Sequence, residues 1–314
     1  MAFLYKDKLE NPGLALRKLL KEEEIIVAPG VFSPSVALLA ESMGFRAVYL
    51  SGAALTGLLA MPDLGIITLT ELAAATKYVT RVISIPLIVD ADTGFGEPIN
   101  VQRTIRELED AGAAAIQIED QVLPKKCGHL KGKTLVSTED MVKKIIAAVD
   151  ARRKDTLIIA RTDARAIEGL EGAIERAKAY VEAGADIIFP EALRSLDEFK
   201  EFVRALPNIP ILANMTEFGK TPYLTVEEFK TAGVKIVIFP VTSFRIAMGA
   251  VRKTFEVLKS EGTQKSLVEG EVSVKIMSRW EFYDLIGYYS YEEVDKSIAS
   301  RTSEIMDRIK EDKK

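Results

Sequence analysis

Short runs of apolar and β-branched residues alternate along the chain with longer amphipathic segments. Most of these runs stay apolar until their last positions, as expected of strands that are buried on both faces of a parallel sheet. The predicted strands are IIVAPGV (25–31), AVYLSG (47–52), PLIVDAD (86–92), AAIQIED (114–120), TLIIARTD (156–163), IIFPEA (187–192), PILANMT (210–216) and KIVIFPV (235–241). The pattern therefore predicts a mainly parallel α/β fold.

The segments between these strands have the periodicity of helices, as at 101–112, 139–153 and 170–184. Several of them end at a glycine, which favours the left-handed backbone that closes a helix. Eight strand–helix units in series, with no linker or low-complexity stretch between them, predict a single (β/α)8 TIM-type barrel. A doubly wound open sheet is the alternative. It fits less well, because no G-x-G-x-x-G motif follows the first strand.

About fifty residues follow the helix that is predicted at 243–262. We interpret residues 1–314 as one barrel domain, in which residues 263–314 form a C-terminal helical extension. The stretch 278–291 contains the only tryptophan and five other aromatic residues. These side chains could pack on their own barrel. Large aromatic side chains are favoured at the cores of interfaces, so we expect the extension to be buried against another subunit.

Composition limits the partners and the compartment. The formal net charge of −4 gives no basic surface that would indicate nucleic acid. The single cysteine cannot form an internal disulfide, and the N-terminal sequence is charged from its sixth residue, unlike a signal peptide. No apolar run approaches the roughly 20 residues that span a bilayer. We expect a cytoplasmic protein that binds neither nucleic acid nor membranes.

Charged or amide side chains end six successive predicted strands. Residues two apart in a strand face the same side, so several of these side chains form pairs on one face. Because the carboxyl ends of barrel strands converge on the face where active sites of this fold are built, the set predicts a catalytic site, although an isolated acidic residue is more often a helix cap. The set comprises Asp90, Asp92, Gln117, Glu119, Arg161, Asp163, Glu191, Asn214, Thr216 and, after the last strand, Arg245.

Three of these carboxylates have the character of metal ligands. Asp90, Asp92 and Glu119 provide hard oxygen atoms, with no histidine or second cysteine nearby. Such ligands suit Mg²⁺, or Mn²⁺, bound by one or two carboxylates with several waters retained. A zinc site built on Cys127 and His129 would lack its remaining soft ligands. The sequence therefore favours magnesium.

Two arginines indicate the class of substrate. Arg161 and Arg245 offer planar guanidinium groups that match carboxylates. The loops after the seventh and eighth predicted strands, NMTEFGKTP and PVTSFR, lack the paired glycines that often hold a phosphate. A small polycarboxylate is therefore the expected substrate.

The only cysteine and the only histidine stand two residues apart in KKCGHLKGK (125–133). The segment follows the predicted metal ligand Glu119, and its glycines would let the backbone move as a closing lid requires. The neighbouring lysines and His129 would favour the thiolate of Cys127 and keep it reactive. A lone cysteine is usually an inert core residue, but these polar flanks fit that role badly.

Two stretches, DADTGFGEP (90–98) and EDQVLPKKCGH (119–129), resemble the isocitrate lyase and phosphoenolpyruvate mutase superfamily. The Lys-Lys-Cys-Gly-His core is similar to the signature of its carbon–carbon lyase branch. The resemblance runs through essentially the whole chain, in VYLSGA (48–53), PDLG (62–65), ARTDA (160–164), FPEA (189–192), NMTEFGKTP (214–222), FPVTSFR (239–245), EGTQKS (261–266) and YYSYEE (288–293).

The resemblance implies a magnesium-dependent lyase that cleaves 2-methylisocitrate to pyruvate and succinate, a step of propionate catabolism in the methylcitrate cycle. Ser-Gly-Ala at 51–53 and NMTEFG at 214–219 favour this substrate, since isocitrate lyases have Ser-Gly-Trp at the first place. Leu-Lys-Gly-Lys after His129 is closer to the isocitrate lyase form. Cleavage of isocitrate or of a dimethylmalate-type acid is thus an alternative. A non-catalytic barrel that binds a dicarboxylate is an alternative of another class.

The resemblance also implies roles for individual residues. Asp90 and Asp92 would hold the metal, with Glu119 and Asp63 joining through water. The catalytic group would consist of Cys127, Arg161, His129 and Lys125. The substrate would be bound by Ser51, Gly52, Ala53, Cys127, Gly128, Arg161, Glu191, Asn214, Met215, Thr216, Arg245 and Arg279. The family fold is a barrel whose eighth helix is exchanged between neighbouring subunits of a homotetramer, which agrees with the aromatic C-terminal extension.

Overall fold

The computed structural model describes residues 9–129, 132–270 and 276–312. Residues 9–251 of these belong to one compact unit and residues 252–312 to another. All the strands of the described chain lie in the first unit. They are β1 (Ile26–Val31), β2 (Val48–Leu50), β3 (Leu87–Asp90), β4 (Ala115–Glu119), β5 (Leu157–Thr162), β6 (Ile187–Pro190), β7 (Leu212–Asn214) and β8 (Ile236–Phe239).

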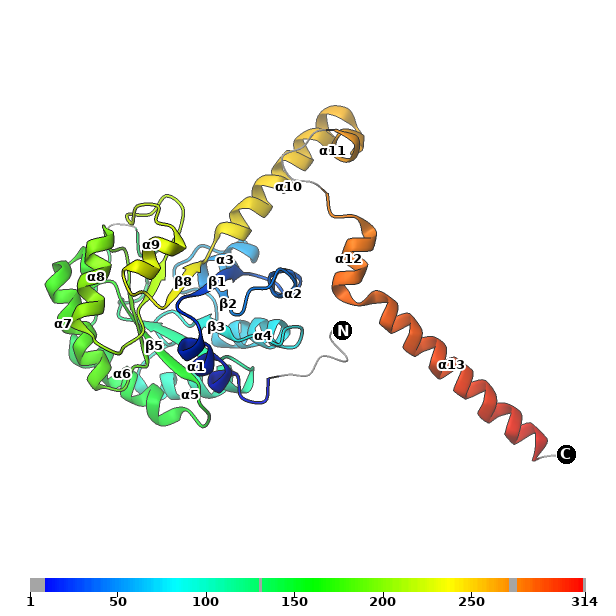
Figure 1. Cartoon of the computed structure of the whole chain (residues 1–314), viewed down its shortest axis with the longest axis horizontal. Coiled ribbons are helices and arrows are strands. Elements are labelled where there is room, and N and C mark those ends of the chain that lie inside the picture. The colour runs from blue at the N-terminus through cyan, green and yellow to red at the C-terminus, as the bar shows by residue number, and fades with distance from the viewer. Residues whose placement is uncertain (1–8, 130–131, 271–275, 313–314) are drawn as a thin grey trace. The chain divides into compact units, whose positions relative to one another are not determined.

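The strands form one parallel sheet that closes on itself (Figure 1). Seven pairings connect the strands in the order β6-β5-β4-β3-β2-β1-β8-β7. A parallel bridge between Ile188 and Ile211 joins the two ends of this order and completes the barrel. Each strand falls within one of the runs predicted from the apolar pattern, so the predicted TIM-type barrel is confirmed.

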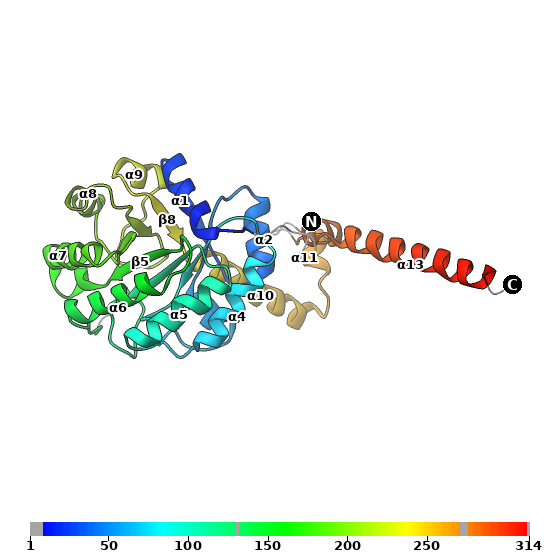
Figure 2. The ribbon, with the colours of Figure 1, turned by 90° about the horizontal axis from the view of Figure 1, so that it is seen from below.

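Helices cover the outside of the sheet (Figure 2). Helix α10 begins in the first unit, and α11 to α13 belong to the second. The helices are α1 (Pro12–Glu22), α2 (Pro34–Ser42), α3 (Gly52–Leu58), α4 (Leu69–Thr80), α5 (Pro98–Asp110), α6 (Thr138–Ala151), α7 (Gly169–Glu182), α8 (Leu196–Ala205), α9 (Val226–Thr231), α10 (Thr242–Glu261), α11 (Lys265–Glu269), α12 (Arg279–Ile286) and α13 (Tyr288–Glu311), with a short 3₁₀ helix at Ala164–Ala166.

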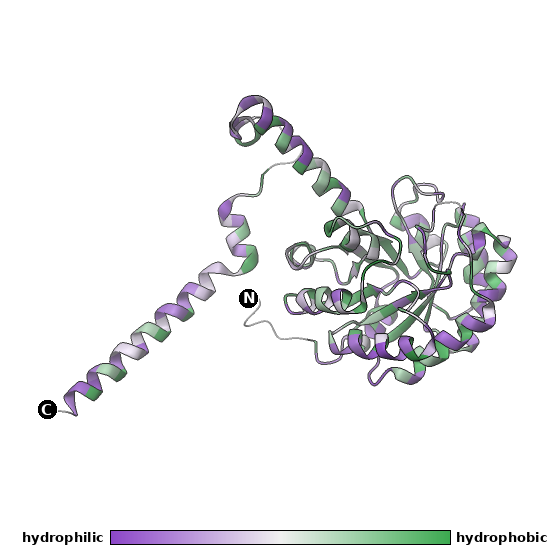
Figure 3. Ribbon diagram, turned by 180° about the vertical axis from the view of Figure 1, so that it is seen from behind, coloured by the Kyte–Doolittle hydropathy of each residue, from purple (hydrophilic) through white to green (hydrophobic). Residues whose placement is uncertain are grey.

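Alternate residues of each strand pack on opposite faces, as the period of two requires. Val89 and Ile158 belong to the core between the sheet and the helices. Ile88, Ile159 and Phe189 belong to the second core, which fills the barrel itself. Figure 3 shows the strands coloured mainly as hydrophobic. The barrel is thus filled with side chains, and polar groups are confined to its rim.

The second unit exposes much of its apolar surface within a single chain. None of the residues of α12 or α13 is buried, and Trp280 is 65% exposed. The rings of Tyr283 and Tyr288 stack with their centroids 4.3 Å apart. Burial of this extension against another subunit, and exchange of a helix between subunits, stay predictions. None of the helices in the described part of the chain is long and apolar enough to cross a membrane.

Candidate active site

The inward-facing positions of the strands continue into a polar layer at their carboxyl ends. Residues two positions beyond the apolar barrel core share its face, so Ile88 is followed by Asp90 and Ile159 by Arg161. Tyr49 of β2 also faces this interior and is 2% exposed. The periodicity that fills the barrel therefore also aims the polar side chains at its mouth.

A chain of hydrogen bonds fixes the first carboxylate. The Tyr49 hydroxyl lies 2.7 Å from Oε1 of Gln117, and Nε2 of Gln117 donates to Oδ1 of Asp90 at 3.0 Å. The backbone N–H groups of Gly52 and Asp92 also donate to the Asp90 carboxylate, at 3.2 Å each. Burial raises the pKa of Tyr49 well above its usual value, so the phenol stays protonated. Asp90 is therefore held in place as a hydrogen-bonded acceptor.

Asp92 and Glu119 are buried carboxylates with spare acceptor capacity. Apart from the cations of Lys125, 2.7 Å from Oδ1 of Asp92, and Arg161, 3.2 Å from Oε2 of Glu119, no described group donates to Oδ1 of Asp92 or to the Glu119 carboxylate. Burial raises the pKa of Asp92 to about 6, even though Lys125 lies close and opposes the shift. Burial likewise raises the pKa of Glu119, against the attraction of Arg161. Buried hard oxygen atoms with acceptor capacity left beyond a single cationic side chain fit a small divalent cation.

Lys125 already supplies one positive charge to this group. Its Nζ lies 2.7 Å from Oδ1 of Asp92 and also pairs with Asp63. Its pKa is raised by the surrounding carboxylates, which outweigh burial, and the ammonium form is retained. In the described chain, no three acidic, imidazole or thiol groups are arranged to enclose an ion by themselves. A Mg²⁺ ion held here would keep several waters, as Mg²⁺ usually does.

Arg161 lies at the centre of the acidic groups. Its guanidinium is 3.2 Å from Glu119, 3.0 Å from Asp163 and 3.9 Å from Glu191, and it lies over the ring of Phe189. The charges of these carboxylates, led by that of Asp163, outweigh burial and raise the pKa of Arg161. Arg161 is therefore a fixed cation that links two sides of the cavity. On one side it contacts Glu119, which belongs with Asp63, Asp90 and Asp92 to the group that we call the metal-type carboxylates, and on the other side it approaches Glu191.

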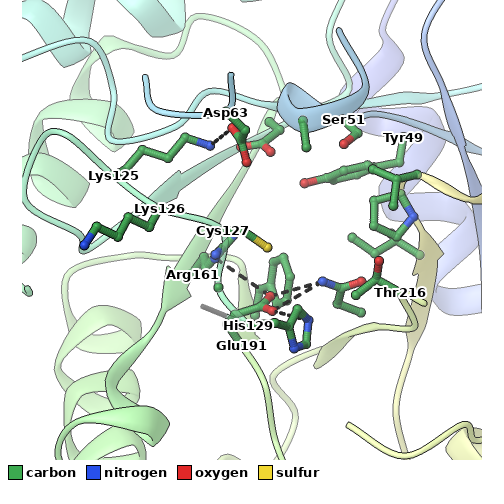
Figure 4. Close-up of a pocket in the computed structure, with 18 of the residues that line it drawn as sticks. Tyr49, Ser51, Asp63, Lys125, Lys126, Cys127, His129, Arg161, Glu191 and Thr216 are labelled. Atoms are coloured by element: carbon green, nitrogen blue, oxygen red, sulfur yellow. Dashed lines mark hydrogen bonds and ion pairs between the residues drawn. The ribbon is translucent and has the colours of Figure 1, made fainter. Parts of the chain in front are cut away.

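The loop between β4 and α6 brings Cys127 to the mouth of the barrel (Figure 4). We call residues 120–137 the cysteine loop, of which residues 130–131 lie outside the described chain. Gln121 pairs with Leu135 across the base of the loop, and its side chain exchanges hydrogen bonds with the backbone of Lys126 at 2.8 and 2.9 Å. The Cys127 sulfur points towards the cavity.

His129 attaches the cysteine loop to the far wall of the cavity. Its Nε2 lies 2.9 Å from Glu191, and its Nδ1 accepts the backbone N–H of Lys220 at 2.9 Å. Nδ1 is therefore the unprotonated nitrogen, and the proton on Nε2 faces the carboxylate. Burial alone would raise the pKa of Glu191, but Arg161 and His129 prevail and bring it to about 2. Glu191 is thus ionised and held from two sides.

The second arginine, Arg245, lies in the first turn of α10 and contacts the loop after β7. Arg245 lies 2.7 Å from the carboxylate of Glu217 and 3.4 Å from the hydroxyl of Thr216, and it stacks over Phe218. Unlike Arg161 it is substantially exposed. Asn214 donates to Glu191 at 3.3 Å. A substrate carboxylate approaching Arg245 would therefore meet an arginine that is already paired with an internal carboxylate.

Most of the residues that the sequence predicts line one cavity. Three further predicted residues do not line the cavity but contact residues that do: Gly52 contacts Asp90, Asp92 contacts Lys125, and Glu119 contacts Arg161. Met215 is buried, and its sulfur accepts the backbone N–H of Leu224. Arg279 begins α12, which belongs to the second unit. The lining residues from the predicted set are Ser51, Ala53, Asp63, Asp90, Lys125, Cys127, Gly128, His129, Arg161, Glu191, Asn214, Thr216 and Arg245.

Sequence reasoning missed several side chains of this region, among them Tyr49, Lys133 and Glu217. Tyr49 reads as a core residue of an apolar strand, although its place two residues before Ser51 on the same face was a usable signal. Lys133 and Glu217 gave no such signal. Their partners Asp163 and Arg245 are 30 and 28 residues away, and only the fold brings them together.

Residues 16–259 match the family model described as phosphoenolpyruvate phosphomutase. The chain belongs to this family. The 2-methylisocitrate lyase of Aeropyrum pernix is 64% identical over 308 residues, which are 98% of this chain and 98% of that protein. The 2-methylisocitrate lyase of Bacillus subtilis is 50% identical over 90% of this chain and 92% of its own length. The resemblance to the superfamily that the sequence motifs indicate is therefore confirmed.

Solved structures of phosphoenolpyruvate phosphomutase family relatives have the same fold. A crystal structure of 2,3-dimethylmalate lyase, a member of the PEP mutase/isocitrate lyase superfamily, is 37% identical with a TM-score of 0.84, covering 92% of this chain and 96% of its own. A phosphonopyruvate hydrolase in complex with oxalate and Mg²⁺ is 33% identical with a TM-score of 0.81, covering 91% of this chain and 98% of its own.

Proposed function

We propose that the protein is a magnesium-dependent carbon–carbon lyase that cleaves 2-methylisocitrate to pyruvate and succinate. The observation that carries this proposal is the meeting of one thiol with two arginines and a group of buried carboxylates in a single cavity at the barrel mouth. The high identity to 2-methylisocitrate lyases over nearly the full chain supports the choice of substrate. The pathway that this reaction serves would be propionate catabolism through the methylcitrate cycle.

Asp90 and Asp92 are the residues that would hold Mg²⁺, with Glu119 and Asp63 joining through water. When bound, the ion supplies Lewis-acid polarisation of the substrate hydroxyl and of its neighbouring carboxylate. The spare acceptor capacity of the buried Asp92 and Glu119 carboxylates supports this assignment. The phosphonopyruvate hydrolase complex supports it by analogy, since that protein was crystallised with Mg²⁺ and oxalate, a dicarboxylate.

The reaction is a retro-aldol-type cleavage. The substrate hydroxyl releases its proton to water, its oxygen becomes the carbonyl oxygen of pyruvate, and the adjacent carbon–carbon bond breaks. The electron pair of that bond moves to the succinyl carbon and is delocalised into the carboxylate next to it. Arg161 would offset charge at the hydroxyl end, and Arg245 would offset it at the succinyl end. Both arginines line the cavity.

Cys127 completes the reaction as general acid. Its S–H donates a proton to the succinyl carbon, and the resulting thiolate regains a proton before the next cycle. In the reverse condensation the thiolate removes that proton. Lys125 and His129 hold the backbone on both sides of Cys127 through their contacts with Asp92 and Glu191. The thiol is thereby presented to the cavity by a loop that is fixed at two flanking residues.

A substrate panel tests this function. Each of 2-methylisocitrate, isocitrate and 2,3-dimethylmalate is supplied as the only substrate, with or without EDTA, and release of the 2-oxo acid product is measured by its reduction with lactate dehydrogenase and NADH. We expect the highest kcat/KM for 2-methylisocitrate and loss of turnover in EDTA that is restored by Mg²⁺ or Mn²⁺. A higher kcat/KM for isocitrate or for 2,3-dimethylmalate would instead assign the protein as a lyase of that substrate. Binding of dicarboxylates without any turnover would favour a sensor.

We also propose that the enzyme is a homotetramer whose C-terminal unit packs against a neighbouring subunit. The absence of buried residues from α12 and α13 supports this, since exposed aromatic side chains such as Trp280 are typical of interface cores. In this arrangement Arg279 would reach an active site through the assembly. Sedimentation velocity tests the proposal: a mass four times the 34.6 kDa of the chain is expected, and a monomer would contradict it.

A further inference from the structure

Lys133 lies in the part of the cysteine loop that leads into α6, and its environment is unusual for a lysine. Its side chain is only 2% exposed, and its Nζ lies 2.6 Å from the fully buried carboxylate of Asp163. The same Nζ donates to the backbone carbonyl of Gly128, the residue after Cys127. Removing a lysine charge from water is costly unless it is paired and hydrogen-bonded. Both partners are present, and each belongs to the active-site region.

Asp163 is a rigid anchor for this contact. It follows β5, and its carboxylate accepts two hydrogen bonds from Arg161, at 3.0 and 3.3 Å. Its backbone N–H donates to Asp120 at 3.0 Å, and Asp120 is in turn held by Thr162 and Tyr180. Lys133 thus connects the cysteine loop to a part of the barrel that is fixed by several buried hydrogen bonds.

Gly128 lies close against the side chains of Glu191 and Arg161 in the cavity wall. A Cβ atom at this residue would lie 2.3 Å from Cγ of Glu191 and 2.7 Å from a guanidinium nitrogen of Arg161. Neither distance is possible between non-bonded atoms, so only glycine allows the backbone to come this close. The peptide that follows Cys127 is therefore fixed by steric contact on one side and by the Lys133 ammonium on the other.

We propose that Lys133 is a positioning residue for the proposed lyase reaction: by joining the Gly128 carbonyl to Asp163, it sets the place of the Cys127 thiol at the barrel mouth. It contacts no metal-type carboxylate and does not line the cavity. Its effect therefore passes through the backbone of the cysteine loop. The proposal rests on the proposed function for its kinetic test, but not for its chemical test.

The chemical test uses the fact that Cys127 is the only cysteine of the chain. The alkylation rate of the metal-free protein by iodoacetamide is measured against pH, and the limiting rate at alkaline pH, where the thiolate is fully formed, reports access to the sulfur. Lys133→Met is expected to raise this limiting rate at least severalfold, and Lys133→Arg to give a smaller increase. The matched control is Lys143→Met, since Lys143 is an exposed, ion-paired lysine on α6.

The kinetic test compares the same variants with 2-methylisocitrate. A displacement of about 1 Å from a reacting atom can cost a hundredfold in rate, so kcat is expected to fall about a hundredfold in Lys133→Met. Lys133→Arg should recover part of the loss, and Lys143→Met should match the native enzyme. Mn²⁺ affinity, measured by calorimetry, should stay unchanged in all variants, because Lys133 touches none of the metal-type carboxylates.

Specific outcomes would overturn the proposal. If folded Lys133→Met has the native kcat and the native limiting alkylation rate, Lys133 does not position Cys127. Loss of thermal stability with no change in alkylation well below the melting temperature would show a structural role only. If Lys133→Met does not fold, a native alkylation rate and kcat in Lys133→Arg would decide against the proposal. If the native protein does not cleave 2-methylisocitrate, the proposed function fails, and the alkylation comparison still decides the role of Lys133.

Discussion

Nζ of Lys125 lies 2.7 Å from Oδ1 of Asp92, inside the group of carboxylates that would hold a metal ion. Asp92 has a backbone φ of 48°, a left-handed conformation that non-glycine residues adopt only when the surroundings impose it. The backbone thus directs the Asp92 side chain towards the buried ammonium group of Lys125. The carboxylate that the metal would need already has one positive partner, and a divalent ion must share it with Lys125.

Asp92→Asn should therefore weaken metal binding and turnover together. The amide keeps the size of the side chain but removes the charge that attracts both Lys125 and the metal. We expect Mn²⁺ affinity, measured by isothermal titration calorimetry, to fall at least tenfold, and kcat to fall by two orders of magnitude or more. Asp197→Asn, on the exposed surface of α8, is the matched control. A metal-independent Asp92→Asn variant of native rate would contradict the ligand assignment.

Cys127→Ser tests the general acid. A serine hydroxyl is a much weaker acid than a thiol, and correctly placed general acids contribute roughly 10² to 10⁴ in rate. We expect pyruvate release to fall by at least this factor, while the affinity for succinate, measured by calorimetry with Mg²⁺ present, changes less than threefold. Retained activity of Cys127→Ser would remove Cys127 from the chemistry, and lost succinate binding would show that it acts in binding.

The fold was largely predictable because eight apolar runs alternate with amphipathic helical segments, and the location of the site was largely predictable because residues two apart in a strand share a face. Asp90, Glu119 and Arg161 lie at the mouth because each continues the inward face of an apolar strand. The pairings across the mouth were not predictable. Contacts such as Lys133 with Asp163 depend on how a loop folds over the barrel, and no local pattern records which charges will meet.

Gly219→Ala should impair catalysis through His129. A Cβ atom at Gly219 would lie 2.8 Å from Cε1 of the His129 ring, so the histidine and the cysteine loop that carries it must move. We expect kcat to fall at least tenfold, with little loss of Mn²⁺ affinity. Gly249→Ala is the matched control, because its new Cβ would meet no atom within 4 Å in the single chain. It should keep the native kcat, and equal effects of both substitutions would contradict a specific role for His129.

Glu191 should make the stability of the protein fall in acid. Its pKa in the folded state is about 2, below the usual value of 4.5, because Arg161 and His129 outweigh burial. A carboxyl group with a lowered folded pKa stabilises the fold above its unfolded pKa, and this contribution is lost as pH falls through the folded value. It is therefore fully present above pH 5 and disappears between about pH 4.5 and pH 2, with a size of about 3 kcal/mol.

Glu191→Gln isolates that contribution. The amide cannot titrate, so the free energy of unfolding of the variant, measured by urea denaturation, should change less than that of the native protein between pH 5 and pH 3. The two proteins should differ most in stability near neutral pH, where the native carboxylate is fully ionised, and converge in acid. Glu139→Gln serves as the matched control, since Glu139 is an exposed residue of α6. Parallel pH profiles of native and Glu191→Gln proteins would show that the ion pairs of Glu191 contribute nothing to folding, and the tethering of the cysteine loop through His129 would then need another source.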